Sequence, residues 1–143
     1  MNREILFQIC DVCEEILNEI SNHLSYLNIS VYKSESISKI NEQIEQLRML
    51  MGSITIATAI EPFLDFEAEK INKVPVPGEC SFSMRVHRLL INIRLVIKNI
   101  RKSYVESEDY SSVDALEKVK KHKATLQSSC PVGSKRWKFL QSI

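Results

Sequence analysis

Residues 35–54, ESISKINEQIEQLRMLMGSI, contain the most regular hydrophobic pattern in this sequence. Aliphatic side chains recur at alternating steps of three and four, at Ile37, Ile40, Ile44, Leu47, Met51 and Ile54. This spacing places them on one face of a helix and has the period of a coiled-coil seam. It predicts a helix over 35–60. We expect Pro62 to end or kink this helix, because proline lacks the backbone N–H that a helix interior requires.

The same periodicity occurs on both sides of this segment. It predicts long helices over 4–27 and 81–104, and weaker patterns predict helices over 63–72, 112–127 and 135–143. In the first segment the apolar positions are Leu6, Ile9, Cys13, Ile16, Ile20, Leu24 and Leu27. The whole chain has only 3 glycines and 4 prolines. This scarcity favours long helices over a turn-rich β architecture.

These segments predict an all-α fold and a single domain over 1–143. The expected architecture is an antiparallel up-down four-helix bundle. The short helix 63–72 lies in its long second connection, and a short helical segment ends the chain. The link 28–34 reaches at most ~25 Å when extended, whereas a helix over 4–27 is ~36 Å long. Such a link cannot carry the chain back to run the second helix parallel to the first.

The two parts of the chain carry opposite charge, although the net charge is only +1. Residues 1–80 contain 6 basic and 13 acidic side chains, and residues 81–143 contain 13 basic and 5 acidic ones. An asymmetry of this size bears on which partners the protein can bind. The two parts could also neutralise each other, within one chain or between two copies.

The pair Cys10 and Cys13, spaced as C-x-x-C, is the nearest approach to a chemical motif. A zinc site would need Cys80 and Cys130 as further ligands, but these two cysteines are far apart in the sequence. The favoured interpretation is that Cys10 and Cys13 are small buried apolar residues of the first helix. No metal or other cofactor is therefore expected.

No catalytic constellation is recognisable. The three histidines have no His or Cys at the helical spacing of three or four residues, and the chain has neither an HExxH sequence nor a glycine-rich phosphate loop. We therefore expect a protein that is not an enzyme. No secretory signal peptide or membrane-spanning run is evident either, so a cytoplasmic or nuclear location is expected.

One face of the predicted helix 81–104 is a candidate partner-binding surface. Ile91 and Leu95 fall opposite its main apolar face, in one row with Arg88, Lys98 and Lys102. Exposed aliphatic residues within a basic row would suit an acidic amphipathic helix. The competing interpretation is that an acidic helix of the same chain covers this row.

A second group of basic residues lies further along the chain. It comprises Lys120, Lys121, Lys123, Lys135, Arg136 and Lys138, with Trp137 among them. Basic side chains beside an aromatic ring can bind a phosphate backbone while the ring stacks on a base. They can also anchor a protein at an anionic membrane surface. For Trp137, packing against the bundle is the favoured alternative.

The leading functional hypothesis is a non-enzymatic interaction module, a subunit or adaptor that docks another protein, or a second copy of itself, on helical faces. The alternative is nucleic-acid binding through the basic C-terminal half. A further alternative is a secreted four-helix signalling protein in which the four cysteines form two disulfides.

Overall fold

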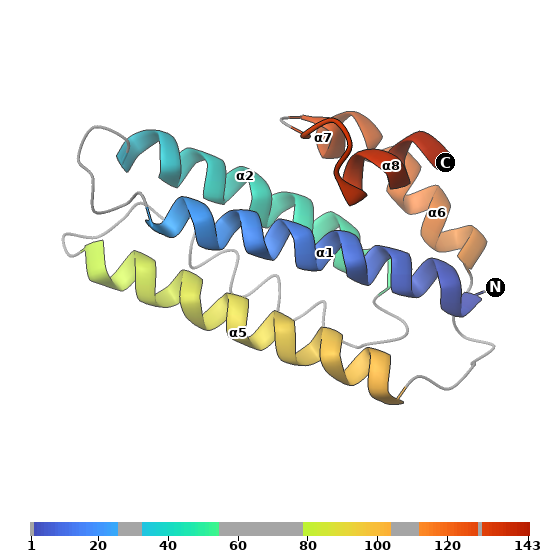
Figure 1. Cartoon of the computed structure of the whole chain (residues 1–143), viewed down its shortest axis with the longest axis horizontal. Coiled ribbons are helices and arrows are strands. Elements are labelled where there is room, and N and C mark those ends of the chain that lie inside the picture. Colours follow the sequence, from blue (N-terminus) through green and yellow to red (C-terminus); the bar gives the residue numbers. More distant parts are fainter. Residues whose placement is uncertain (1, 26–32, 55–78, 104–111, 129) are drawn as a thin grey trace.

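The computed structural model describes residues 2–25, 33–54, 79–103, 112–128 and 130–143 (Figure 1). They form six helices: α1 (Asn2–Ser25), α2 (Lys33–Gly52), α5 (Glu79–Ser103), α6 (Ser112–Lys121), α7 (Lys123–Gln127) and α8 (Lys135–Ser142). No strand occurs in these ranges, so the all-α prediction is confirmed. The expected short helix 63–72 and the expected break at Pro62 lie outside the described residues.

The central element is α1, against which α2, α5, α6 and α8 all pack. In Figure 1 it lies between α2 and α5, with the C-terminal helices gathered near its N-terminal half. Its buried side chains are Leu6, Ile9, Cys10, Val12, Cys13, Ile16, Leu17, Ile20 and Leu24. The apolar stripe predicted from the sequence is therefore confirmed from Leu6 to Leu24. Val12 and Leu17 are buried as well, because α1 is covered from more than one side.

Both α2 and α5 run antiparallel to α1. Along α1 and α2, Cys13 contacts Met51 and Glu19 contacts Gln43. Along α1 and α5, Asp11 contacts Arg101 and Asn18 contacts Arg94. In both pairs the partner number falls as the position on α1 rises, so α2 and α5 point in the same direction.

The alternating order predicted for the bundle therefore holds between α1 and α2 but not between α2 and α5. The link-length argument constrained the connection 28–34, but it did not constrain residues 55–78. A segment of that length can extend to ~80 Å, well beyond the ~30 Å of α2. It is long enough for α5 to begin at the same end of α1 as α2, on the other side of α1 (Figure 1).

The coiled-coil-like seam of the second helix contributes to the core as predicted. Ile40, Ile44, Leu47, Met51 and Ile54 are buried, and Ile37 packs against them in part. On α5 the core face consists of Val86, Leu89, Leu90, Ile93 and Ile97. Removing each such side chain from water stabilises the fold by roughly 1.5–3 kcal/mol.

The second helix ends at Gly52, earlier than the predicted Ile60. Ser53 and Ile54 form a turn, in which the Ser53 hydroxyl donates a hydrogen bond of 2.5 Å to the Leu50 carbonyl. Glycine is a poor helix former and is common just past helix ends. Gly52 therefore favours the end of the helix here, although the apolar spacing continues to Ile54. The predicted helix 112–127 is likewise divided into α6 and α7, with His122 at the break.

Candidate functional site

The outer face of α5 carries one continuous row of side chains, which we name the α5 stripe. It consists of Met84, Arg88, Ile91, Leu95, Lys98 and Lys102. These positions recur at steps of three and four, so at ~100° per residue they share one face of the helix. Ile91 is 64% exposed, Leu95 is 55% exposed and Met84 is 62% exposed. The sequence predicted this surface without Met84, which lies seven residues before Ile91 on the same face.

The charges of α5 divide between two faces. Arg101 faces α1, where its Nη2 atom lies 2.6 Å from Asp11 Oδ1 and its Nε atom lies 3.0 Å from Glu14 Oε1. By contrast, the three basic residues of the α5 stripe are exposed and form no ion pair with another residue that the structure describes. The charge asymmetry of the chain is thus neutralised in part at the α1–α5 contact, while the α5 stripe stays basic.

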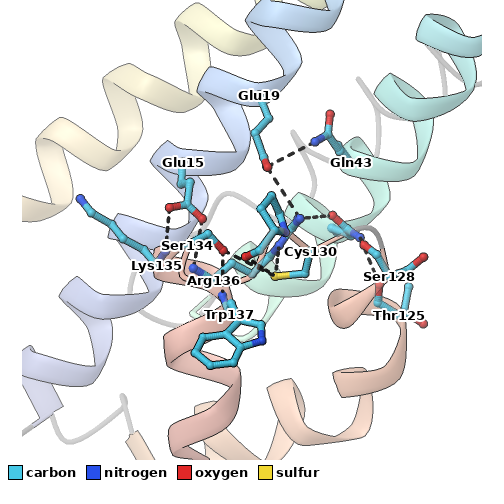
Figure 2. Close-up of polar contacts among 12 residues, drawn as sticks. Glu15, Glu19, Gln43, Thr125, Ser128, Cys130, Ser134, Lys135, Arg136 and Trp137 are labelled. Atoms are coloured by element: carbon cyan, nitrogen blue, oxygen red, sulfur yellow. Dashed lines mark hydrogen bonds and ion pairs between the residues drawn. The ribbon is translucent and has the colours of Figure 1, made fainter.

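A second polar arrangement fastens the start of α8 to α1 (Figure 2). The Glu15 carboxylate accepts hydrogen bonds from the backbone N–H groups of Lys135, at 2.8 Å, and Arg136, at 3.0 Å. Ser134 caps the same helix by accepting from the Trp137 N–H at 3.1 Å. The first N–H groups of a helix lack partners within it and carry partial positive charge, so an anion there is stabilising.

The Arg136 side chain extends from α8 into the interior and is only 1% exposed. Its Nη1 atom donates to Gln46 Oε1 at 2.6 Å, and its Nε atom lies 3.3 Å from Cys130 Sγ. Its Nη2 atom is 3.8 Å from Glu19 Oε2, a longer ion pair. A buried guanidinium needs such partners, because an isolated charge in the interior is costly.

Gln46 joins this arrangement to a third element. Its Nε2 atom donates to the backbone carbonyls of Thr125, at 3.0 Å, and Ser128, at 3.3 Å, which lie at the end of α7 (Figure 2). Gln46 thus binds both Arg136 and two carbonyls at the C-terminal end of α7, where the Thr125 carbonyl also accepts from the Ser128 N–H. We name Glu15, Glu19, Gln46, Cys130 and Arg136 the Arg136 cluster.

The structure corrects one of the proposed nucleic-acid contacts. Arg136 is buried, so it cannot bind a phosphate group while α8 is in place. The rest of that set is divided among several positions. Lys120 and Lys121 are exposed on α6, Lys123 is half-buried in α7, Lys135 and Lys138 are exposed on α8, and Trp137 is half-buried.

The cysteines do not form a chemical site among the described residues. Cys10 and Cys13 are buried free thiols, and burial raises the pKa of Cys10 to about 12 and that of Cys13 well above its usual 9.0. Both therefore remain protonated at neutral pH. Cys130 is also a free thiol, in the Arg136 cluster. The side chain of Cys80 lies outside the described residues.

A cavity of about 230 Å³ adjoins the Arg136 cluster, between α1, α2 and the link from α7 to α8. Burial raises the pKa of Glu19, an effect that the nearby Arg136 charge opposes. Burial also lowers the pKa of His23, and the Lys39 charge lowers it further. The cavity is lined by polar side chains and one proline: Glu19, Asn22, His23, Lys39, Glu42, Gln43, Gln46, Ser128, Pro131 and Arg136.

Comparison of the chain with protein-family models, with curated proteins and with solved structures finds no match. Within the described ranges, no helix is both long and apolar enough to cross a membrane. The same ranges contain no group of three or more His, Cys, Asp and Glu side chains that could hold a metal ion. A function must therefore be argued from the α5 stripe, the Arg136 cluster and the cavity.

Proposed function

We propose that this chain is a non-enzymatic protein–protein interaction module, a subunit or an adaptor of the cytoplasm or nucleus. It docks a helical segment of another protein on the α5 stripe. The observation that carries the proposal is the exposure of Met84, Ile91 and Leu95 in one row of a 25-residue helix. Large aliphatic side chains grouped on a regular helix are typical of surfaces that receive an amphipathic partner helix.

The charge of the α5 stripe indicates what kind of partner fits. Arg88, Lys98 and Lys102 lie among the aliphatic residues, and no acidic residue occurs between 81 and 104. A partner helix with an apolar row flanked by Glu or Asp is complementary in both respects. Two copies that paired symmetrically through this stripe would bring like charges together, so a different acidic chain is favoured over self-association.

The proposal includes a single helical-bundle domain over 1–143. Packing of α2, α5 and α6 against α1 supports a four-helix arrangement, with α8 as a short C-terminal addition. The helix directions described above replace the alternating order. One cooperative unfolding transition, identical by circular dichroism and by Trp137 fluorescence, is expected of such a domain. Two separate transitions would contradict it.

The test of docking uses a fluorescent peptide with a leucine row flanked by glutamates, and a scrambled peptide of equal charge. The double variant Ile91→Asp/Leu95→Asp should weaken binding of the first peptide at least about tenfold, since central apolar anchors dominate such interfaces. Val113→Asp is the matched control, because Val113 is 64% exposed but lies on α6. Equal affinity of the double variant and the wild type would refute the proposal.

Nucleic-acid binding is the second candidate, supported by the exposure of Lys120 and Lys121 on α6. Its signature is a steep, linear fall of log affinity with log salt, because each phosphate contact releases counterions. The burial of Arg136 removes one of the expected contacts. A secreted protein with two disulfides would pair all four cysteines, and the free thiols of Cys10, Cys13 and Cys130 give that alternative no support.

A further inference from the structure

Arg94 borders the α5 stripe on the side that faces α1. It lies three residues after Ile91 and four residues before Lys98, spacings at which side chains are neighbours on a helix surface. Its guanidinium Nη2 atom donates to Asn18 Oδ1 at 3.1 Å and to Ser21 Oγ at 3.2 Å. Two side chains of α1 therefore hold this guanidinium at the edge of the exposed surface.

The partners of Arg94 on α1 are neutral, whereas those of Arg101 are charged. Arg101 lies seven residues later on α5 and pairs with Asp11 at 2.6 Å and with Glu14 at 2.9 Å. Arg94 is exposed and forms no ion pair with another residue that the structure describes. The contact with α1 thus neutralises one arginine of α5 and leaves the other with its positive charge uncompensated.

Arg94 also retains N–H donors for a further acceptor. A guanidinium carries donors on all three of its nitrogen atoms. Both contacts with α1 come from Nη2, so the N–H groups of Nε and Nη1 make no hydrogen bond with a described residue. A carboxylate that accepts from them would form a charge-assisted hydrogen bond, which is roughly twice as strong as one between neutral groups.

The contacts with α1 restrict the Arg94 side chain before any partner binds. Ordering a long side chain during binding costs conformational entropy, and this cost lowers affinity. Asn18 and Ser21 hold the Arg94 guanidinium in the free protein, so less of the cost remains for the binding step. By contrast, no hydrogen bond or ion pair with another described residue orders Lys98 or Lys102.

We propose that Arg94 binds a carboxylate of the partner helix and thereby determines specificity at the α5 stripe. This inference rests on the docking function proposed above. It assigns to the partner an Asp or Glu at the edge of its apolar row that lies nearest α1. A partner with the same apolar row but no acid at that position should bind more weakly, because it would cover the Arg94 charge without pairing it.

A double-mutant cycle with the fluorescent leucine–glutamate peptide tests this assignment. Arg94→Gln removes the charge but keeps a polar side chain, and it should weaken peptide binding about fivefold. Peptides in which one glutamate at a time is replaced by glutamine locate the carboxylate. One of them should bind the wild-type protein about fivefold more weakly than the parent peptide does, yet bind the Arg94→Gln variant as tightly as the parent peptide does.

Asn18→Asp provides a second test, which leaves every residue of the α5 stripe in place. A carboxylate at this position would pair with Arg94 as Asp11 pairs with Arg101, so the guanidinium would be neutralised within the chain. Affinity for the parent peptide should therefore fall about threefold or more. Gln127→Glu is the matched control, because it makes the same change of net charge at an exposed position of α7 and should leave the affinity unchanged.

The outcomes separate this inference from the proposed function. If Ile91→Asp/Leu95→Asp weakens binding but Arg94→Gln does not, the α5 stripe docks a helix without Arg94 and the inference is wrong. It is also wrong if each glutamine-substituted peptide loses as much affinity for Arg94→Gln as for the wild type, or if Asn18→Asp has no larger effect than Gln127→Glu. If the double variant binds as tightly as the wild type, the docking function itself is refuted.

Discussion

The α5 stripe and the Arg136 cluster use basic side chains in opposite ways. On α5, Arg88, Lys98 and Lys102 are exposed around Ile91 and Leu95. On α8, Arg136 is buried and its guanidinium binds groups from α2 and from the α7–α8 link. The two segments look alike in composition, since both mix basic with large apolar residues. Basic residues in such a segment can therefore serve either recognition or cohesion, and the packing of the helix decides which.

The difference follows from where each helix meets α1. α5 lies along α1 with one broad apolar face, so its opposite face remains in water (Figure 1). The start of α8 meets α1 end-on, where Glu15 binds the backbone N–H groups of Lys135 and Arg136. This contact directs the Arg136 side chain between α1 and α2 (Figure 2).

The largest effect is expected from Arg136→Met. The variant removes the guanidinium but keeps an apolar stem, so Gln46 Oε1 and Glu19 lose a donor in the interior. Breaking a buried ion pair in this way should lower the free energy of unfolding by about 3 kcal/mol. Urea denaturation measures the loss. Lys138→Met, at an exposed position of the same helix, should change stability by no more than about 0.5 kcal/mol. If the two variants are equally stable, Arg136 contributes nothing to cohesion.

A smaller loss is expected from Glu15→Ala. This substitution removes the carboxylate that accepts from two N–H groups at the start of α8. Loss of an N-terminal cap of this kind should cost about 1 kcal/mol, and amide hydrogen exchange should accelerate in α8 more than in α1. Glu117→Ala, at an exposed position on α6, is the control. Unchanged amide exchange in α8 would show that the Ser134 cap alone stabilises the N-terminus of α8.

The smallest effect on stability is expected from Ile91→Asp/Leu95→Asp, although this variant should weaken docking at least about tenfold. Both side chains are already in water, so the free energy of unfolding should change by no more than about 0.5 kcal/mol. Thermal and urea unfolding of this double variant and of Arg136→Met, measured under the same conditions, would compare the two losses of stability. A loss comparable to that of Arg136→Met would mean that the α5 stripe packs against part of the same chain.

Much of the fold was predictable because helical periodicity is a local property. The apolar positions of α1, α2 and α5 were identified from spacing alone, and their burial follows from the tendency of such faces to leave water. Gly52 was overlooked as a helix end, since the apolar period continues to Ile54. The direction of α5 was not predictable from link length, because residues 55–78 are long enough to allow either direction.

The candidate surfaces were predictable to different degrees. The α5 stripe was identified from helical geometry, because a face opposite the core side of a straight helix remains outside. Arg136 was assigned to a solvent-facing basic patch, and its local sequence contains no signal for burial. Its partners Glu19 and Gln46 are distant in sequence. The polar cavity likewise exists only where α1, α2 and the α7–α8 link converge.

The sequence by itself determined the helices, their apolar faces and the basic outer row of α5. Each of these depends on residues three or four positions apart, so the periodicity of a single helix is sufficient. Only the tertiary structure decided the common direction of α2 and α5, the burial of Arg136 and the polar cavity. These features arise where segments separated by tens of residues pack together. The local pattern of either segment is compatible with several such packing arrangements.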